Sequence, residues 1–480
     1  MLRQLVRDSA VYGLSRVLVQ GLSFLMVPLY TRVLTPVDFG ALDVLTVCAA
    51  IAAVVVALEV SQGMARFFAD STTEEEKAVY ASTSLWFALA AYSIFALVAI
   101  VFARGISRAL LDTAAFERVV QVAVLSAWSN GLLMLVLNQL RADLKAALYG
   151  ITSFTYALVT LATTVVLVLL LRLGITGFFL AQLLGNCVGL ALAVHFSRKR
   201  FRLAFDWARL QEMLAFSLPL VPSSIGVLVT LYVDRFAIKE FMTLADVGVF
   251  GVGYRLAAVL GLVVGSFQRA LTPLIYTHYR NPDTPAQLAR IFRYFMVLAL
   301  LMVLGVGLFA GEIMRVFAAP EYQAAAQVVP LLAAAVVVSN MYIFAPGLDI
   351  AKRTGVIALI NVGGAGLTAG LNYLLVPLWG LQGAAFATCL SATAVFSAYM
   401  TFSQRLYRVP HVWLPLGAAV SAAVAVFLLA LTVAPRAGWL SVGLRLALLA
   451  GAFVLFVALG LLPRTDLRRG WVGARGRLPV

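Results

Sequence analysis

Apolar runs of about 20 residues recur along this chain, from near its first residue to about position 460. A helix needs about 20 apolar residues to cross the roughly 30 Å hydrocarbon core of a bilayer. A membrane β-barrel would instead show short segments of alternating polarity, and this sequence lacks them. The sequence therefore predicts an all-α membrane protein that crosses the bilayer many times.

The composition agrees with this class and excludes a second one. The chain has 480 residues, of which 62% are hydrophobic and 12% charged, and its net charge is +15. In a soluble protein that charge would suggest a nucleic-acid partner, but here Lys and Arg lie mainly in loops between apolar runs. Membrane topology and anionic headgroups explain this pattern, so we expect no nucleic-acid partner. The three cysteines lie inside apolar runs without metal or disulfide spacing, at positions Cys48, Cys187 and Cys389.

Fourteen transmembrane spans are predicted, and no loop between them exceeds about twenty residues. The spans are 10–33, 38–60, 79–103, 116–138, 147–171, 175–196, 213–237, 247–270, 291–311, 324–346, 354–378, 382–403, 412–434 and 439–462. An even number places both termini on one side, which carries 24 Lys and Arg against nine on the other. This bias predicts that both termini are cytoplasmic.

An internal repeat divides the chain. When the sequence is aligned with itself after a shift of 208 residues, Thr35, Asp38 and Gly40 align with Thr243, Asp246 and Gly248. After a shift of 206 residues, the segment 174–177 aligns with the segment 380–383. We therefore expect two six-helix bundles, 1–204 and 205–408, followed by two further helices and a basic tail in 409–480. Because each half has an even number of spans, the bundles are expected to be related by a pseudo-two-fold axis along the membrane normal.

Several segments carry a resemblance to a known family. They are LTPVDFG at 34–40, SLPLVPSS at 217–224, VDRFAIKEF at 233–241, ADVGVFGVGYRLAAVL at 245–260 and GLQGAAFATCLS at 380–391. They resemble the polysaccharide flippases, of the O-antigen type, in the multidrug/oligosaccharidyl-lipid/polysaccharide exporter superfamily. The resemblance extends from the first helix to about residue 405.

This resemblance implies a function. It implies a bacterial inner-membrane protein that moves undecaprenyl-pyrophosphate-linked oligosaccharide from the cytoplasmic to the periplasmic leaflet by alternating access. Its partners would be that lipid-linked oligosaccharide, membrane lipids and polysaccharide assembly proteins. We expect no cofactor and no metal, and coupling to a proton or sodium gradient stays open.

A flippase of this kind needs cations for the pyrophosphate and polar groups for the sugars. Arg16 and Gln20 share one face of the first helix, although Arg16 could instead extend to the cytoplasmic headgroups. Arg255 and Arg269 lie on the eighth helix. Arg255 is too deep to reach the surface easily, whereas Arg269, near the cytoplasmic end, could instead be a headgroup anchor. Guanidinium groups stay charged and bind phosphate oxygens in pairs, so these residues are substrate-binding candidates.

Three other charged residues are candidates. Asp234 and Arg235 could form a gate ion pair or contact substrate, or could mark an ordinary helix end at the interface. Because adjacent residues do not face each other on a helix, we expect their partners elsewhere. Glu59 could titrate and couple transport to ions, or could belong to a structural ion pair.

Two other function classes remain open. A cation-coupled drug antiporter of the same superfamily would need carboxylates in its cavity, whereas most of the charges placed inside spans here are arginines. A membrane-embedded polysaccharide polymerase would need a large extramembrane domain, and the loops are too short for one. We therefore expect a transporter without catalytic residues.

Overall fold

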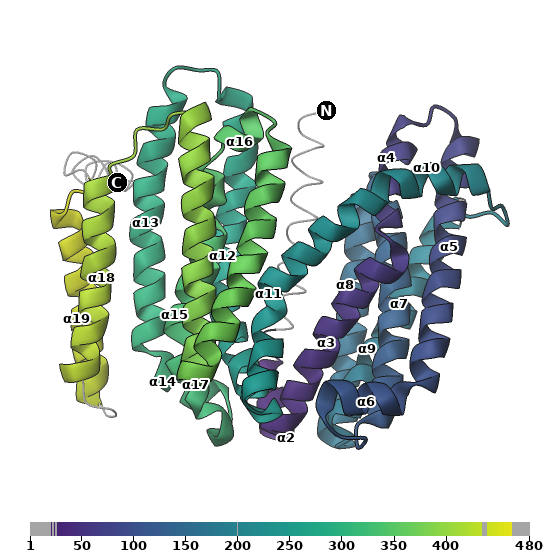
Figure 1. Ribbon diagram of the computed structural model, residues 1–480, viewed down its shortest axis with the longest axis horizontal. Coiled ribbons are helices and arrows are strands. Elements are labelled where there is room, and N and C mark those ends of the chain that lie inside the picture. The colour runs from purple at the N-terminus through teal and green to yellow at the C-terminus, as the bar shows by residue number, and fades with distance from the viewer. Residues whose placement is uncertain (1–20, 22–23, 25, 199, 434–438, 463–480) are drawn as a thin grey trace, which may run out of the picture. The chain divides into compact units, whose positions relative to one another are not determined.

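The computed structural model describes residues 21, 24, 26–198, 200–433 and 439–462, and every regular element in these residues is a helix (Figure 1). The helices up to residue 241 are α2 (Val27–Val33), α3 (Pro36–Ala57), α4 (Val60–Asp70), α5 (Glu74–Val101), α6 (Ala103–Leu111), α7 (Glu117–Ala142), α8 (Ala146–Thr164), η1 (Val165–Leu170), α9 (Gly174–Ser197), α10 (Trp207–Ser217), η2 (Leu218–Leu220) and α11 (Val221–Phe241). The rest are α12 (Leu244–His278), α13 (Thr284–Leu308), α14 (Ala310–Phe317), η3 (Pro320–Gln327), α15 (Val329–Ser339), η4 (Met341–Phe344), α16 (Gly347–Ile350), α17 (Thr354–Leu406), α18 (Trp413–Val433) and α19 (Trp439–Ala458).

Eleven of the described helices are long and apolar enough to cross a membrane, or up to twelve if the bent pair η3 and α15 is one span. The fold is thus that of a multi-pass membrane protein, but the predicted number of fourteen spans is not confirmed. Most of the predicted first span, 10–33, lies outside the described residues. Helix α17 has 53 residues, about 80 Å at 1.5 Å per residue, which exceeds one bilayer crossing. It breaks at Gly380, whose φ of 56° and ψ of −134° are not helical, between the predicted spans 354–378 and 382–403.

The chain forms two compact units. The first contains Met1–Val252 with Phe317–Tyr322 and Thr368–Leu381, and the second contains Gly253–Val316, Gln323–Leu367 and Gln382–Val480. The predicted division into 1–204, 205–408 and 409–480 is a different partition, based on a sequence repeat, and it stays a prediction.

In the first unit, helix α9 packs against α7 and α8, and α7 also packs against α3 and α5 (Figure 1). Apolar side chains from α3, α4, α5, α7, α9 and α10 form one buried core, which includes Met64, Tyr92, Leu133 and Met213. The short helix α10 packs on α4 and α5, and its Arg209 pairs with Glu76 at 3.3 Å. The segment before the second half of the chain is therefore fixed to the first bundle.

In the second unit, helix α13 packs against α15, α18 and α19. An ion pair joins Arg445 of α19 to Glu312 of α14, and both side chains are largely shielded from solvent. Because charges inside a span are costly unless they are paired, this contact favours one position of α19 against α14. The last two helices are thus attached by a specific contact as well as by apolar packing.

Helices α3 and α12 begin with the same local structure. The hydroxyl of Thr35 donates to Asp38 at 2.8 Å, and the Asp38 backbone N–H donates back to the Thr35 hydroxyl at 3.2 Å. Thr243 and Asp246 repeat both hydrogen bonds, at 2.6 and 3.2 Å. Each pair forms a capping box, with a carboxylate at the positive end of the helix. The residues that the 208-residue shift pairs in sequence therefore adopt equivalent local structures.

The first turns of these two helices also touch each other through glycine. A Cβ atom on Gly40 would lie 1.8 Å from the Leu244 carbonyl oxygen, and one on Gly248 would lie 2.1 Å from the Pro36 carbonyl oxygen. The 208-residue shift that aligns Gly40 with Gly248 also aligns Pro36 with Leu244, so the two contacts are equivalent. Only hydrogen atoms fit between these backbones, so glycine is required at both positions.

We expect Gly40→Ala and Gly248→Ala to destabilise the protein, because the added methyl group must push two backbones apart. Overpacking of this kind typically costs about 1–3 kcal/mol. Gly417→Ala in α18 is the control, because no atom lies within 4 Å of its Cβ position and alanine favours a helix by up to ~1 kcal/mol. Thermal unfolding in detergent should show lower midpoints for the first two variants only. Unchanged midpoints for Gly40→Ala and Gly248→Ala would contradict the close contact.

Candidate functional site

Three charged side chains meet between α3 and α11 in the first unit. Asp43 of α3 and the adjacent Asp234 and Arg235 of α11 are 5%, 3% and 3% exposed. We call this group the Asp43 cluster. The Arg235 guanidinium donates from Nη1 to Asp234 Oδ1 at 2.7 Å, and its Nε lies 3.9 Å from Asp43 Oδ2. Arg235 thus pairs with a carboxylate on its own helix and with a carboxylate on α3.

Aromatic rings and backbone groups complete the surroundings of Arg235. Its guanidinium lies over the rings of Tyr232, at 5.5 Å, and Phe250 of α12, at 5.4 Å. It also donates from Nη1 to the Leu231 carbonyl oxygen at 3.2 Å. Cation–π contacts strengthen when water is excluded, and here the cation and the Phe250 ring are both buried. The sequence therefore supplies a shielded position for a charge that would otherwise be costly in a span.

This geometry corrects two expectations. The partners of Asp234 and Arg235 were expected elsewhere than on each other. Arg235 does have a partner on α3, Asp43, but its long side chain also bends back to Asp234. The other interpretation was a helix end at the membrane interface, whereas both residues are buried and lie six or seven residues before the end of α11 at Phe241. Whether either residue contacts substrate is not tested by this arrangement.

Glu59 lies at a break between α3 and α4. Leu58 and Glu59 both adopt left-handed backbone conformations, with φ of 49° and 54°. Such conformations cost of order 1–3 kcal/mol each for residues other than glycine. Two serines stabilise the break: Ser217 donates to the Leu58 carbonyl oxygen at 2.8 Å, and Ser224 of α11 donates to Glu59 Oε1 at 2.7 Å. Strain of this kind, held in place by specific hydrogen bonds, is frequent at functional sites.

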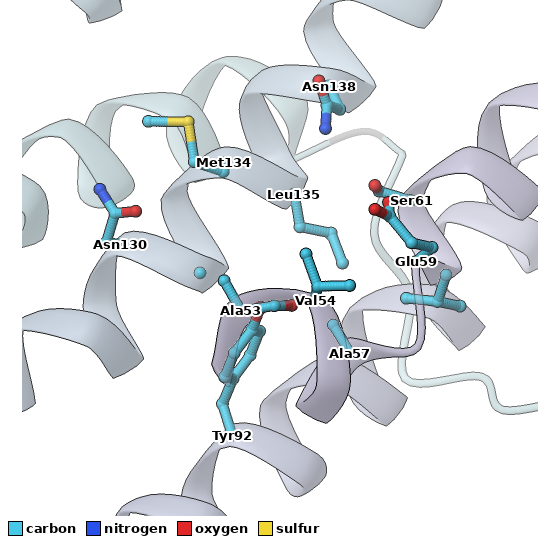
Figure 2. Close-up of a pocket in the computed structure, with 12 residues that line it drawn as sticks. Ala53, Val54, Ala57, Glu59, Ser61, Tyr92, Asn130, Met134, Leu135 and Asn138 are labelled. Atoms are coloured by element: carbon cyan, nitrogen blue, oxygen red, sulfur yellow. The ribbon is translucent and has the colours of Figure 1, made fainter. Parts of the chain in front are cut away.

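A cavity of about 170 Å³ lies beside this break, between α3, α4, α5 and α7, and we call it the Glu59 cavity. Figure 2 shows Glu59 and Ser61 together at one end and Asn130 at the other, with Asn138 and Tyr92 on the walls. Tyr92 donates its hydroxyl to the Ala53 carbonyl oxygen at 3.0 Å. Pockets for small organic molecules typically measure about 300–1,000 Å³, so this cavity suits water or a small ion better than an organic substrate.

The remaining predicted site residues belong to the second unit or lie outside the described residues. Arg255 lies on α12, eleven residues after Leu244, and is half-buried. Arg269, farther along the same helix, is exposed, and its Nη2 donates to the Ser266 hydroxyl at 3.0 Å. Arg16 and Gln20 lie outside the described residues. Among the predicted substrate-binding residues that the structure describes, Asp234 and Arg235 lie in direct contact.

Two features were missed in the sequence. Asp43 lies inside the predicted span 38–60, farther from its ends than Asp38 and Glu59, and the argument that selected Arg255 from its depth would also have selected Asp43. Asn130 and Asn138 carry no comparable signal, because asparagine is common on helix surfaces. Within the described residues, no group of three or more His, Cys, Asp or Glu could hold a metal ion.

The fold is shared with solved transporter structures. A lipid II flippase, MurJ, in an inward closed conformation matches with a TM-score of 0.71 and 12% identity, over 94% of this chain and 98% of that chain. An inward-facing multidrug resistance MATE family transporter of the MOP superfamily matches with a TM-score of 0.66 and 15% identity, over 82% of this chain and 97% of that chain. A Vibrio cholerae MATE transporter, VcmN, matches with a TM-score of 0.56 and 17% identity, over 85% of this chain and 97% of that chain. At these identities the likeness shows the fold.

The chain therefore shares its fold with a lipid II flippase and with a transporter described as a member of the MOP superfamily, as the resemblance implied. The sequence also matches a described family, "Polysaccharide biosynthesis protein", over residues 5–277. The chain belongs to this polysaccharide biosynthesis protein family. No curated protein matches the sequence significantly.

Ser217→Ala should destabilise the break at Leu58 and Glu59. Ser217 is fully buried, so its loss leaves the Leu58 carbonyl oxygen without this donor at a cost of about 1–3 kcal/mol. Ser223→Ala is the control, since Ser223 is exposed near the start of α11. The measurement is the thermal unfolding midpoint in detergent, and equal midpoints for the two variants would show that the hydrogen bond does not support the break.

Proposed function

We propose that the protein is a flippase that moves a lipid-linked oligosaccharide across the bacterial inner membrane. The supporting observation is the combination of its family, matched over residues 5–277, with a fold shared along 94% of the chain with a lipid II flippase. The family relates the chain to polysaccharide synthesis, and the fold relates it to movement of molecules across a membrane. An undecaprenyl-pyrophosphate-linked repeat unit of O-antigen, capsule or exopolysaccharide satisfies both.

The direction of transport follows from the proposed topology. With fourteen spans and both termini cytoplasmic, α3 and α12 begin on the periplasmic side and α3 ends on the cytoplasmic side. The substrate would enter from the cytoplasmic leaflet, where its synthesis is expected, and leave on the periplasmic side. Its pyrophosphate needs cations during passage, and its polyprenyl chain stays in the lipid. Arg16, Gln20, Arg255 and Arg269 are the proposed contacts for the polar part, with polysaccharide assembly proteins as further partners.

The direct test uses purified protein in liposomes that contain a fluorescent undecaprenyl-pyrophosphate oligosaccharide. Protein-dependent movement of the lipid to the other leaflet, without any change in its mass, would support the proposal. A new covalent product that depends on the protein would overturn it. Export of cationic dyes without lipid movement would support the drug-antiporter alternative instead.

The Glu59 cavity is too small to be a drug site, although Glu59 supplies a carboxylate. Its volume of about 170 Å³ is roughly half the lower limit for organic ligands. A proton or a small cation fits there. We therefore include Glu59 in the proposal as the residue that couples lipid movement to an ion gradient.

Arg255→Ala should abolish lipid movement, whereas Arg255→Lys should retain part of it. A guanidinium inside a span costs ~2.5–3.5 kcal/mol by insertion scales, so an arginine without a function there would be unfavourable. Lysine keeps the charge but loses the paired hydrogen bonds to phosphate. Both variants should insert normally, because alanine relieves the insertion cost. Normal surface glycan from the Ala variant at native expression would remove Arg255 from the site.

Glu59→Gln should uncouple transport from an imposed pH gradient. Glutamine keeps an oxygen that can accept the hydrogen bond from Ser224 but cannot exchange a proton. Lipid movement in liposomes should then become independent of the gradient. Glu75→Gln, on an exposed side chain paired with Arg202, is the control and should behave as the natural protein does. A gradient response that survives in Glu59→Gln would assign coupling to another residue.

A further inference from the structure

The Asp43 cluster lies where three helix ends come together. Asp43 is seven residues after the start of α3 at Pro36, and Arg235 is six residues before the end of α11 at Phe241. The two-residue connection Met242–Thr243 then leads into α12, whose first turn touches α3 through Gly40 and Gly248. The cluster thus lies about two turns inside a tightly packed junction, on the side where α3 and α12 begin.

The charges in the cluster tie α3 to α11. Arg235 lies 3.9 Å from Asp43 across the helix interface, and both side chains are almost completely buried. A buried charge pair that loses one member leaves an uncompensated charge, which is strongly unfavourable. Separation of α3 from α11 at this level therefore requires Arg235 to leave one carboxylate and to depend on another group.

Asp234 supplies that other group on the same helix. It accepts a 2.7 Å hydrogen bond from Arg235 Nη1, shorter than the approach of Asp43. Because Asp234 moves with Arg235, this pair survives when α11 leaves α3. A second carboxylate helps to satisfy the five N–H donors of a buried guanidinium in any arrangement. Because this carboxylate lies on the helix of Arg235 itself, it also lowers the cost of a state in which α11 has left α3.

We propose that Asp43, Asp234 and Arg235 form a reversible lock on this side of the transporter, in which Asp43 favours the closed state and Asp234 favours the open state. Asp43 and Arg235 hold α3 against α11 while the substrate path faces the other side. Opening releases Arg235 from Asp43 but leaves it paired with Asp234. The three residues are positioning residues for transport and need not contact the substrate. The proposal rests on the proposed function only for the need to open this side.

The lock makes a prediction that a purely structural ion pair does not make. Asp43→Asn weakens the closed state and should increase opening, whereas Asp234→Asn weakens the open state and should decrease it. Both substitutions preserve side-chain size and remove one negative charge. A structural cluster would instead respond to both in the same direction, through a general loss of stability.

Opening can be measured by thiol labelling at Val47. This residue lies one turn beyond Asp43 on the same face of α3 and is 3% exposed. In a background with Cys48, Cys187 and Cys389 changed to serine, Val47→Cys gives a single thiol that a membrane-impermeant maleimide reaches only when the lock is open. The full-length protein is used in intact cells or in oriented proteoliposomes. Lys239→Ala is the matched control, since Lys239 lies one turn farther along α11 and pairs with the exposed Asp112.

We expect Asp43→Asn and Arg235→Ala to raise the labelling rate about 5- to 10-fold, the low end of typical coupling between conformational states. Asp234→Asn should lower it by a similar factor, and Lys239→Ala should leave it unchanged. If Arg235→Ala does not fold, the two asparagine variants still decide the question. Shifts in the same direction, or no shift in either, would overturn the lock. Opposite shifts in a protein that moves no lipid-linked oligosaccharide would support the lock and reject the proposed flippase activity.

Discussion

The close contact between the first turns of α3 and α12 determines the geometry of the junction. Leu244 and Pro36 present carbonyl oxygens where a Cβ atom of Gly40 or Gly248 would have to lie. Two helices that approach this closely have a defined crossing position, because small shifts produce backbone overlap. The capping boxes fix the start of each helix, so the contact is specified in register as well as in distance. Asp43 then lies close to Arg235 as a consequence of backbone packing.

Burial changes what the charges of the junction can do. On a surface, Asp234 and Arg235 would contribute little, because water and salt screen exposed pairs. Here both are 3% exposed, and the guanidinium is covered by the rings of Tyr232 and Phe250. Such an environment makes each charge depend on its partner. Well-packed apolar residues of similar volume often stabilise a buried position as well as an ion pair does, so the three charges favour a role beyond attachment.

Local features were predictable from the sequence, and long-range contacts were not. The length of the apolar runs identified the main spans. The break at Gly380 lies between the predicted spans 354–378 and 382–403. Both features depend on residues close together in the sequence. The repeat led to Thr243 and Asp246, since a capping box needs only residues three apart. The hydrogen bond from Ser224 to Glu59 joins residues 165 positions apart, and no pattern in one sequence specifies it. The expectation that Asp234 and Arg235 have their partners elsewhere holds for Arg235 and Asp43, but it missed the contact between the two neighbours. The rule for adjacent residues describes Cβ directions and does not include the reach of a flexible arginine.

Helices α3 and α11 are connected near both of their ends, and the two connections differ in chemistry. At the end of α3, Glu59 accepts a hydrogen bond from Ser224, which lies in the first turn of α11. Toward the other end, Asp43 faces Arg235. Eleven residues separate Ser224 from Arg235, about 16 Å along the helix, so opening at one connection need not disturb the other. The first connection is a hydrogen bond beside a cavity, whereas the second depends on a guanidinium that stays charged. The two ends of the helix pair therefore separate by different events: loss of one hydrogen bond at Glu59, and separation of a buried charge pair at Arg235.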